Sequence, residues 1–239
     1  MVDSPWRRTA ALLLVAAAVA CAGVAGCSRA ASHPAMVASS APSKPSAGPF
    51  SAAKLRDALL TRVNGVAAVA PAAAGDYASL PDGSAGKPSA TAVIVTPSAC
   101  GGATMTGFNP AALAGSPAAA ATFRVGKNGV SEMLVASSVR LASTALAGQL
   151  PARCAHYKET VEGKTFRYTA EESTITGIGT LARVLNVRPS GGAVDNLWSL
   201  VYQGAGFVGS VTVVGPNASE AAVRELGEQA YAFAVKSLS

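Results

Sequence analysis

The sequence predicts an α+β fold, a single domain with an antiparallel sheet and helices packed on one face of it. The second half of the chain holds several short segments rich in Val, Thr and aromatic residues, and short loops separate them. One of these, residues 164–170, alternates Phe, Tyr and Ala with polar residues, as does a strand with one wet face. Stretches with helical spacing of apolar residues come before and after the strands, and the sheet needs such helices as a second layer.

The first 26 residues have the pattern of a bacterial export signal. Arg7 and Arg8 precede an uncharged run of small and apolar residues. This run ends in Val-Ala-Gly-Cys27, which resembles the lipobox of bacterial lipoproteins, where small residues let a signal peptidase cut and a cysteine thiol takes acyl chains such as palmitate. We therefore expect Cys27 to be the first mature residue and to anchor the protein in the membrane.

Two other interpretations of this region stay open. The cut could fall before Cys21, although Ala stands where an aliphatic residue is usual three positions before that cysteine. The uncharged run, residues 9–26, is also near the length at which a helix spans a bilayer, so it could remain as an uncleaved anchor. Both place the rest of the chain outside the membrane.

Three segments follow from this reading: a signal peptide at 1–26, a tether at 27–48 and an extracytoplasmic α+β domain at 49–239. The tether is rich in Ser, Ala and Pro and has no apolar periodicity, so we expect it to be disordered.

The first half of the domain is predicted to mix helices, loops and strands. A helix begins at the possible cap Ser51 and turns Leu55, Ala58 and Leu59 inward. Residues 65–88 read mostly as loop. The β-branched run 91–96 predicts a buried strand, and strands at 121–125 and 130–136 flank the turn residues Asn128-Gly129. A helix is expected over 139–150, with Leu141, Ala145 and Leu146 inward.

The second half predicts a meander and a closing helix. Its strands are expected at 164–170, 181–188, 195–203 and 207–214. Asn217 or Ser219 can cap the last helix. Its inward stripe is expected to contain Val223, Leu226, Ala230 and Phe233 or Ala234.

Cys100 and Cys154 are the cysteines left over for the folded domain. In an exported protein such a pair most often forms a disulfide, and we predict that bond. A redox or metal role is the alternative, but the chain has no Cys-x-x-Cys, and His156 is the one histidine near them in sequence. We expect no metal site.

No motif predicts an enzyme or a bound cofactor. The glycines of 204–209 match a dinucleotide-binding pattern, but a β-branched strand follows them where a helix is required, so we expect a hairpin. His156 lacks a nucleophile elbow, and the acidic pairs Glu171-Glu172 and Glu159 with Glu162 read as solvated charges. The full chain has a net charge of +6, but after residue 26 its basic residues are scattered and form no run, which does not favour a nucleic-acid partner.

Aromatic side chains on the late strands are the best place for a ligand. Trp198, Tyr202 and Phe207 could line an apolar pocket between sheet and helices, although their alternation is more often that of core residues. We take them as tentative ligand-binding residues for a lipid-like or other apolar envelope ligand.

The order of features resembles actinobacterial, especially mycobacterial, lipoproteins of unknown function that are related to the extracellular sensor domain of the receptor kinase PknH. These features are the lipobox, the Ser/Pro tether, the first helix, Thr-Pro-Ser-Ala-Cys100 after a strand, Cys154 after a helix, Trp198 on a late strand and the closing helix. The resemblance covers residues 50–239 and implies an α+β domain with a cleft for ligand sensing. Such domains generally carry two disulfides, and this chain can form one.

We therefore expect a binding or sensor-like domain, lipid-anchored at the outer face of the cell membrane, with no catalysis. The alternatives are a structural or surface-exposed envelope lipoprotein without a small ligand and, as the third, an envelope hydrolase.

Overall fold

The computed structural model of the protein describes residues 48–80, 93–100, 110–147, 150–190 and 196–239. All of them belong to one compact unit. The predicted signal peptide, Cys27 and the tether up to residue 47 lie outside the described residues. Within the described ranges, no helix has both the length and the apolar character needed to cross a membrane.

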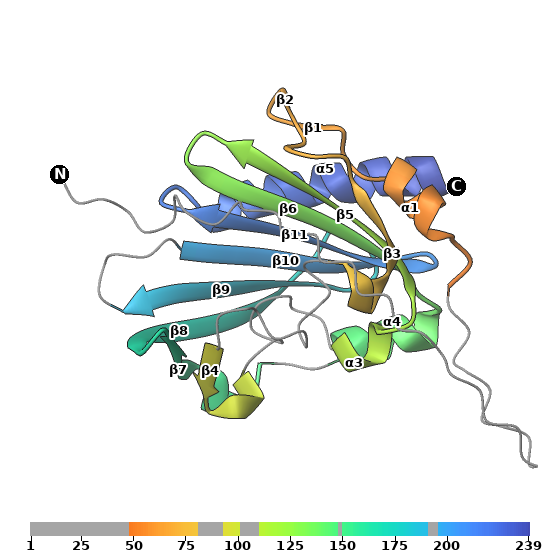
Figure 1. Ribbon diagram of the computed structural model, residues 1–239. Helices are drawn as coiled ribbons and strands as arrows, with labels where there is room; N and C mark the ends of the chain where they lie inside the picture. Colours follow the sequence, from red (N-terminus) through yellow and green to blue (C-terminus); the bar gives the residue numbers. More distant parts are fainter. Residues whose placement is uncertain (1–47, 81–92, 101–109, 148–149, 191–195) are drawn as a thin grey trace, which may run out of the picture. The chain divides into compact units, whose positions relative to one another are not determined.

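In the described residues, nine strands form one antiparallel sheet in the order β3-β5-β6-β11-β10-β9-β8-β7-β4 (Figure 1). The strands are β3 (Ala73–Asp76), β4 (Val93–Thr96), β5 (Pro117–Val125), β6 (Asn128–Ala136), β7 (His156–Val161), β8 (Lys164–Ile175), β9 (Ala182–Ser190), β10 (Asn196–Gly204) and β11 (Phe207–Gly215). A separate small hairpin contains β1 (Arg62–Val63) and β2 (Val66–Ala67). The helices are α1 (Ala52–Asp57), α3 (Pro110–Leu113), α4 (Val139–Leu146) and α5 (Glu220–Leu238), with short 3-10 turns η2 (Tyr77–Ser79), η3 (Ser98–Cys100) and η4 (Ala152–Cys154).

The predicted meander is confirmed, since β8, β9, β10 and β11 pair in chain order. The glycine-rich segment 204–209 is the predicted hairpin between β10 and β11, and Gly206 in its turn has a φ of 84°. The N-terminal hairpin β5–β6 then joins the meander along β6 and β11, where Ala136 lies opposite Phe207.

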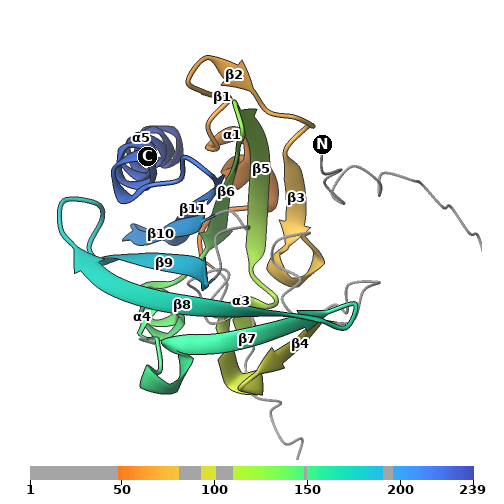
Figure 2. The ribbon, with the colours of Figure 1, turned by 90° about the vertical axis from the view of Figure 1, so that its left-hand side faces the viewer.

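Helices cover both faces of the sheet, as Figure 2 shows for α5 and α4. The α+β class, the single domain and the packing of the C-terminal helix on the sheet are confirmed. Along β10, Leu200 and Tyr202 point to the core shared with α1 and α5, whereas Val201 points to the core shared with α4. The helices are therefore not confined to one face, because both faces of the central strands are apolar and each needs cover.

Serine side chains cap the N-termini of α1, α4 and α5. Ser51 accepts a hydrogen bond from the N–H of Lys54, and Ser138 caps α4 in the same way. Ser219, not Asn217, caps α5 by accepting from the N–H of Ala222. The inward stripe of α5 contains Ala234, while Phe233 is half-buried.

Four local predictions need correction. The helix expected over 139–150 ends at Leu146, and Ala142 is buried in it whereas Leu141 is half-buried. The strand predicted at 91–96 is expected to be buried, but its described part, β4, is an edge strand, and Ile94 is 61% exposed. The β5–β6 turn lies at 126–127, because Val125 already pairs with Asn128. Residues 73–76, expected as loop, form the other edge strand, since β5 needs a partner there.

Candidate functional site

The three aromatic residues predicted to bind a ligand lie together on the face of the sheet that α5 covers. Tyr202 and Phe207 are fully buried, with ring centroids 6.3 Å apart, and Tyr202 also packs against Tyr231 of α5. Trp198 lies on the same core as a partly buried residue. None of the three lines either of the pockets described below, so their role in ligand binding stays a prediction.

The predicted disulfide is present. Cys100 and Cys154 are bonded and completely buried, and their Cα atoms are 5.3 Å apart. His156 follows in β7 as an exposed strand residue. Among the described residues, no group of three or more His, Cys, Asp or Glu side chains could hold a metal ion.

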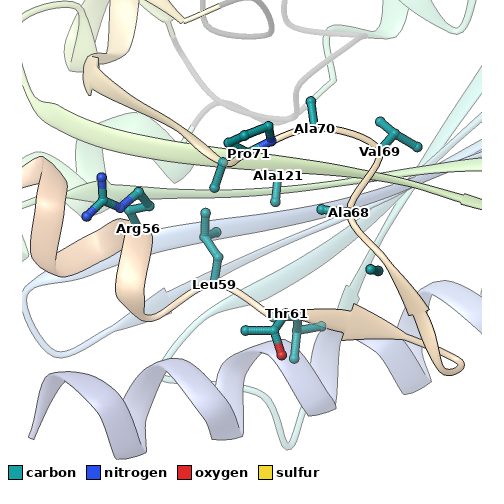
Figure 3. A pocket seen from close by; sticks show the side chains of 11 residues that line it. Arg56, Leu59, Thr61, Ala68, Val69, Ala70, Pro71 and Ala121 are labelled. Carbon is teal, nitrogen blue, oxygen red and sulfur yellow. The ribbon is translucent and has the colours of Figure 1, made fainter.

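A pocket of about 500 Å³ opens where the chain leaves α1 and returns along β5 (Figure 3). We call residues 59–72 the arm. The pocket is lined by Arg56 of α1, by residues 59–61 and 67–72 of the arm, and by Ala121 of β5. In Figure 3, Leu59 points from the arm toward Ala121.

Local turn chemistry gives the arm its shape. The β1–β2 hairpin turns at Asn64 and Gly65, whose φ values of 49° and 77° are those that a two-residue type I′ turn requires. The arm then returns to the sheet, where the N–H of Val69 donates to the carbonyl oxygen of Thr122 at 2.9 Å. The sequence prediction of a loop missed this hairpin, although Asn-Gly between two valines is its usual signal.

The side chains of this pocket are mostly apolar. Its lining is apolar except for Arg56 and the hydroxyl of Thr61. On the arm, Val66 and Val69 are 38% and 62% exposed, and exposed apolar side chains around an apolar hollow are typical of a ligand or partner site. Arg56 is the one titratable group in the lining, so the lining offers no acid and base pair for catalysis.

A buried carboxyl group lies behind the pocket. Glu132 of β6 is 1% exposed and is the cross-strand partner of Ala121. Its Oε2 accepts a hydrogen bond from the N–H of Leu60 at 2.8 Å. In the described part of the chain, its Oε1 has no hydrogen-bond partner, and neither has the buried hydroxyl of Tyr202. Burial raises the pKa of Glu132 to about 8 against the lowering effect of the Leu60 hydrogen bond, so the side chain is protonated at pH 7.

Glu132 also affects Tyr202. Burial raises the pKa of the Tyr202 hydroxyl, and the nearby Glu132 and Tyr231 raise it further. Sequence reasoning did not select Glu132, but a signal was present: on its strand it is in phase with the core residues Val130 and Leu134.

The sheet separates the side chains of the adjacent acidic residues Glu171 and Glu172. Glu171 and Glu172 pair across the strands with Asn186 and Leu185, so their side chains point to opposite faces as expected. Glu171 forms an exposed ion pair with Arg188. Glu162 lies in the β7–β8 turn. Burial raises the pKa of the half-buried Glu159, and a hydrogen bond with Tyr168 lowers that pKa to a smaller extent.

Glu172 lines a second pocket of about 410 Å³ near the disulfide. Its carboxylate was predicted to be solvated, which is wrong: it forms an ion pair with Arg183, and the side chains of Glu172 and Arg183 are 15% and 7% exposed. The N–H of Leu150 also donates to Glu172, at 2.5 Å. Since both carboxylate oxygens have partners, this ion pair is a structural feature of the sheet, and the pocket beneath the arm is the stronger candidate for a ligand site.

Two solved structures of mycobacterial proteins are similar to this chain. One is the extracellular domain of PknH from Mycobacterium tuberculosis, with a TM-score of 0.49 and 15% identity over 81% of this chain and 99% of that one. The other is an uncharacterised protein from Mycobacterium smegmatis, the Rv0999 ortholog, with a TM-score of 0.35 and 17% identity over 72% and 85% of the two chains. No protein-family model and no curated protein matches the sequence. The PknH-like domain named from the sequence is thus among the similar structures, and at these values the likeness carries no argument about ligand or activity.

Proposed function

We propose that the chain is a lipid-anchored, extracytoplasmic binding or sensor-like module of the cell envelope, and that it takes a small apolar ligand in the pocket beneath the arm. The single observation that carries the ligand site is this pocket of about 500 Å³, with its apolar lining and the exposed Val69 at its rim. Its size is that of small-molecule sites in general.

The proposed location has separate support. The lipobox-like sequence before Cys27 favours acylation, and the buried disulfide favours a compartment in which thiols are oxidised. The proposed absence of catalysis is based on the pocket lining, which contains one titratable group, Arg56.

The ligand proposal is tested by filling the pocket in cell-derived protein. Ala68→Phe puts a ring where a partly buried arm residue lines the pocket, and Ala74→Phe puts the same ring on an exposed position of β3 outside it. We expect an acyl or other apolar species to co-purify with the wild type and with Ala74→Phe, and to be lost from Ala68→Phe, as measured by organic extraction and mass spectrometry.

A wild-type protein that carries no such species would contradict the ligand proposal and favour the structural lipoprotein. The anchor is tested apart from the ligand by intact mass and fractionation of Cys27→Ala, which we expect to lose the acyl mass and leave the membrane fraction. An unmodified residue 27 in the wild type would contradict the anchor alone.

A further inference from the structure

The arm is attached to the sheet by a hydrogen bond whose acceptor is an uncharged acid. The N–H of Leu60 donates to Oε2 of Glu132 across 72 residues of sequence, and Leu60 itself lines the pocket. Ala121, which lies opposite Glu132 on β5, lines the pocket as well. The Glu132 side chain is therefore next to two residues of the pocket lining, Leu60 and Ala121.

Among the residues that the structure describes, no cation forms an ion pair with Glu132. β5 and β11 place Ala121 and Val211 beside it, and the nearby titratable groups from β10 and α5 are the hydroxyls of Tyr202 and Tyr231. The charged side chains of α1 are all exposed at the surface: Lys54, Arg56 and Asp57.

An ionised Glu132 would consequently be a buried charge with one backbone N–H as partner. Such a charge is costly in an apolar core, and a structure relieves it by admitting water or by moving the segment that covers it. The arm is that segment, because Leu60 is in direct contact with the carboxyl group and the tip of the hairpin, residues 64–67, is exposed.

We infer that Glu132 is a proton-linked positioning residue of the pocket: while it holds its proton the arm stays closed on β5, and when it ionises the arm opens and the pocket loses its ligand. The inference rests on the proposed function for the ligand, but the movement of the arm does not depend on any ligand. It goes beyond the proposed function by naming what regulates the site.

The pH range follows from linkage. Burial raises the pKa of Glu132 to about 8 in the closed form, and a solvated carboxyl has the ordinary value of 4.5. The equilibrium constant for opening should therefore rise by about tenfold per pH unit between about pH 5 and pH 8, and level off above pH 8. Glu132→Gln removes the titratable group but keeps the shape of the side chain and an oxygen that can accept the hydrogen bond from Leu60.

The first test is amide hydrogen exchange on the full mature chain. After correction for the intrinsic pH dependence of exchange, we expect the opening constant at Leu60 and Val63 to rise with the slope given above in the wild type and to be flat in Glu132→Gln. Amides of the central strand β11, such as that of Val211, should exchange far more slowly than those of the arm. Equal slopes in the two proteins, or arm amides that exchange only together with β11, would overturn the inference.

The second test measures the pocket with 1-anilinonaphthalene-8-sulfonate, whose sulfonate does not titrate in this range. We expect its affinity for the wild type and for the control Glu171→Gln to fall as the pH rises from 6 to 8, and its affinity for Glu132→Gln to stay constant. Binding that is pH-independent in all three proteins contradicts the inference and leaves the proposed site intact. Absence of binding, or binding that Ala68→Phe does not alter, contradicts the proposed site, and the exchange experiment then decides the inference alone.

Discussion

Glu132 is buried and Glu172 is partly buried, on opposite faces of one sheet, and each accepts a hydrogen bond from the backbone N–H of a segment that lies over it. Glu172 also has a cation, Arg183, whereas Glu132 forms no ion pair within the described part of the chain. The Glu172 side is cross-linked by the disulfide and carries a compensated charge. The Glu132 side is neutral only while the acid holds its proton. The comparison predicts that the Glu132 side responds to pH near neutrality.

The largest expected effect is on the cross-linked side. Replacing both Cys100 and Cys154 by Ser opens a loop between positions 54 apart, which should lower the free energy of unfolding by about 4 kcal/mol in the chain-entropy model. Denaturant titration of the variant and of the wild type, each under non-reducing conditions, measures the difference. A loss below about 1 kcal/mol would mean that the core around the bond holds this side without it.

The next effect concerns the compensating cation. Arg183→Ala leaves Glu172 without its cation and should cost about 3 kcal/mol of stability, because a largely buried charge loses its compensation. Arg188→Ala is the matched control, since its exposed pair with Glu171 connects the same two strands and should be worth less than about 1 kcal/mol. Similar losses in the two variants, by denaturant titration, would contradict the distinction between buried and exposed pairs.

Removal of the uncompensated acid should have the opposite sign. The folded protein holds the Glu132 proton more tightly than the unfolded chain, so wild-type stability should fall as the pH rises from about 4.5 to about 8 and then level off. Glu132→Gln should abolish this contribution and should be more stable than the wild type by about 2 to 3 kcal/mol at pH 7. Thermal unfolding of both proteins at pH 5, 7 and 9 tests it, and a variant that is less stable at every pH would show that the acid has a partner in solution.

The smallest effect sharpens the description of the Glu132 side. Tyr202→Phe removes a buried hydroxyl without a hydrogen-bond partner and should stabilise the protein by about 1 kcal/mol, while the ring keeps its packing against Phe207. Tyr231→Phe, at a half-buried position, should be nearly neutral. If Tyr202→Phe is destabilising in the wild type but not in Glu132→Gln, the two polar groups are coupled and the acid is not isolated.

The elements that the sequence predicted well are those whose own residues decide their structure. The alternation around Tyr168 and Ala170 and the inward stripe of α5 follow from local pattern, and both are confirmed. Ala73–Asp76 has no β-branched residue, and it is a strand only because the distant β5 offers it an edge.

The candidate site could not be predicted from the sequence for a similar reason. The pocket is formed by the arm and by Ala121, and the burial of Glu132 depends on Leu60. These contacts join segments far apart in sequence, so periodicity along either segment does not show them. The aromatic residues chosen from the sequence are large and apolar, which made them equally good core residues, and two of them are fully buried.

The pairing of β6 with β11 determines when the sheet can finish folding. It joins the N-terminal strands β3, β5 and β6 to a block in which β4, an early segment, lies at the far edge beyond β7. For a chain that crosses a membrane with its N-terminus first, neither edge strand can dock on arrival, and the two blocks cannot meet before β11 has emerged. Such distant pairing is slow. Such a chain would therefore expose its incomplete sheet until nearly all of its residues have crossed the membrane.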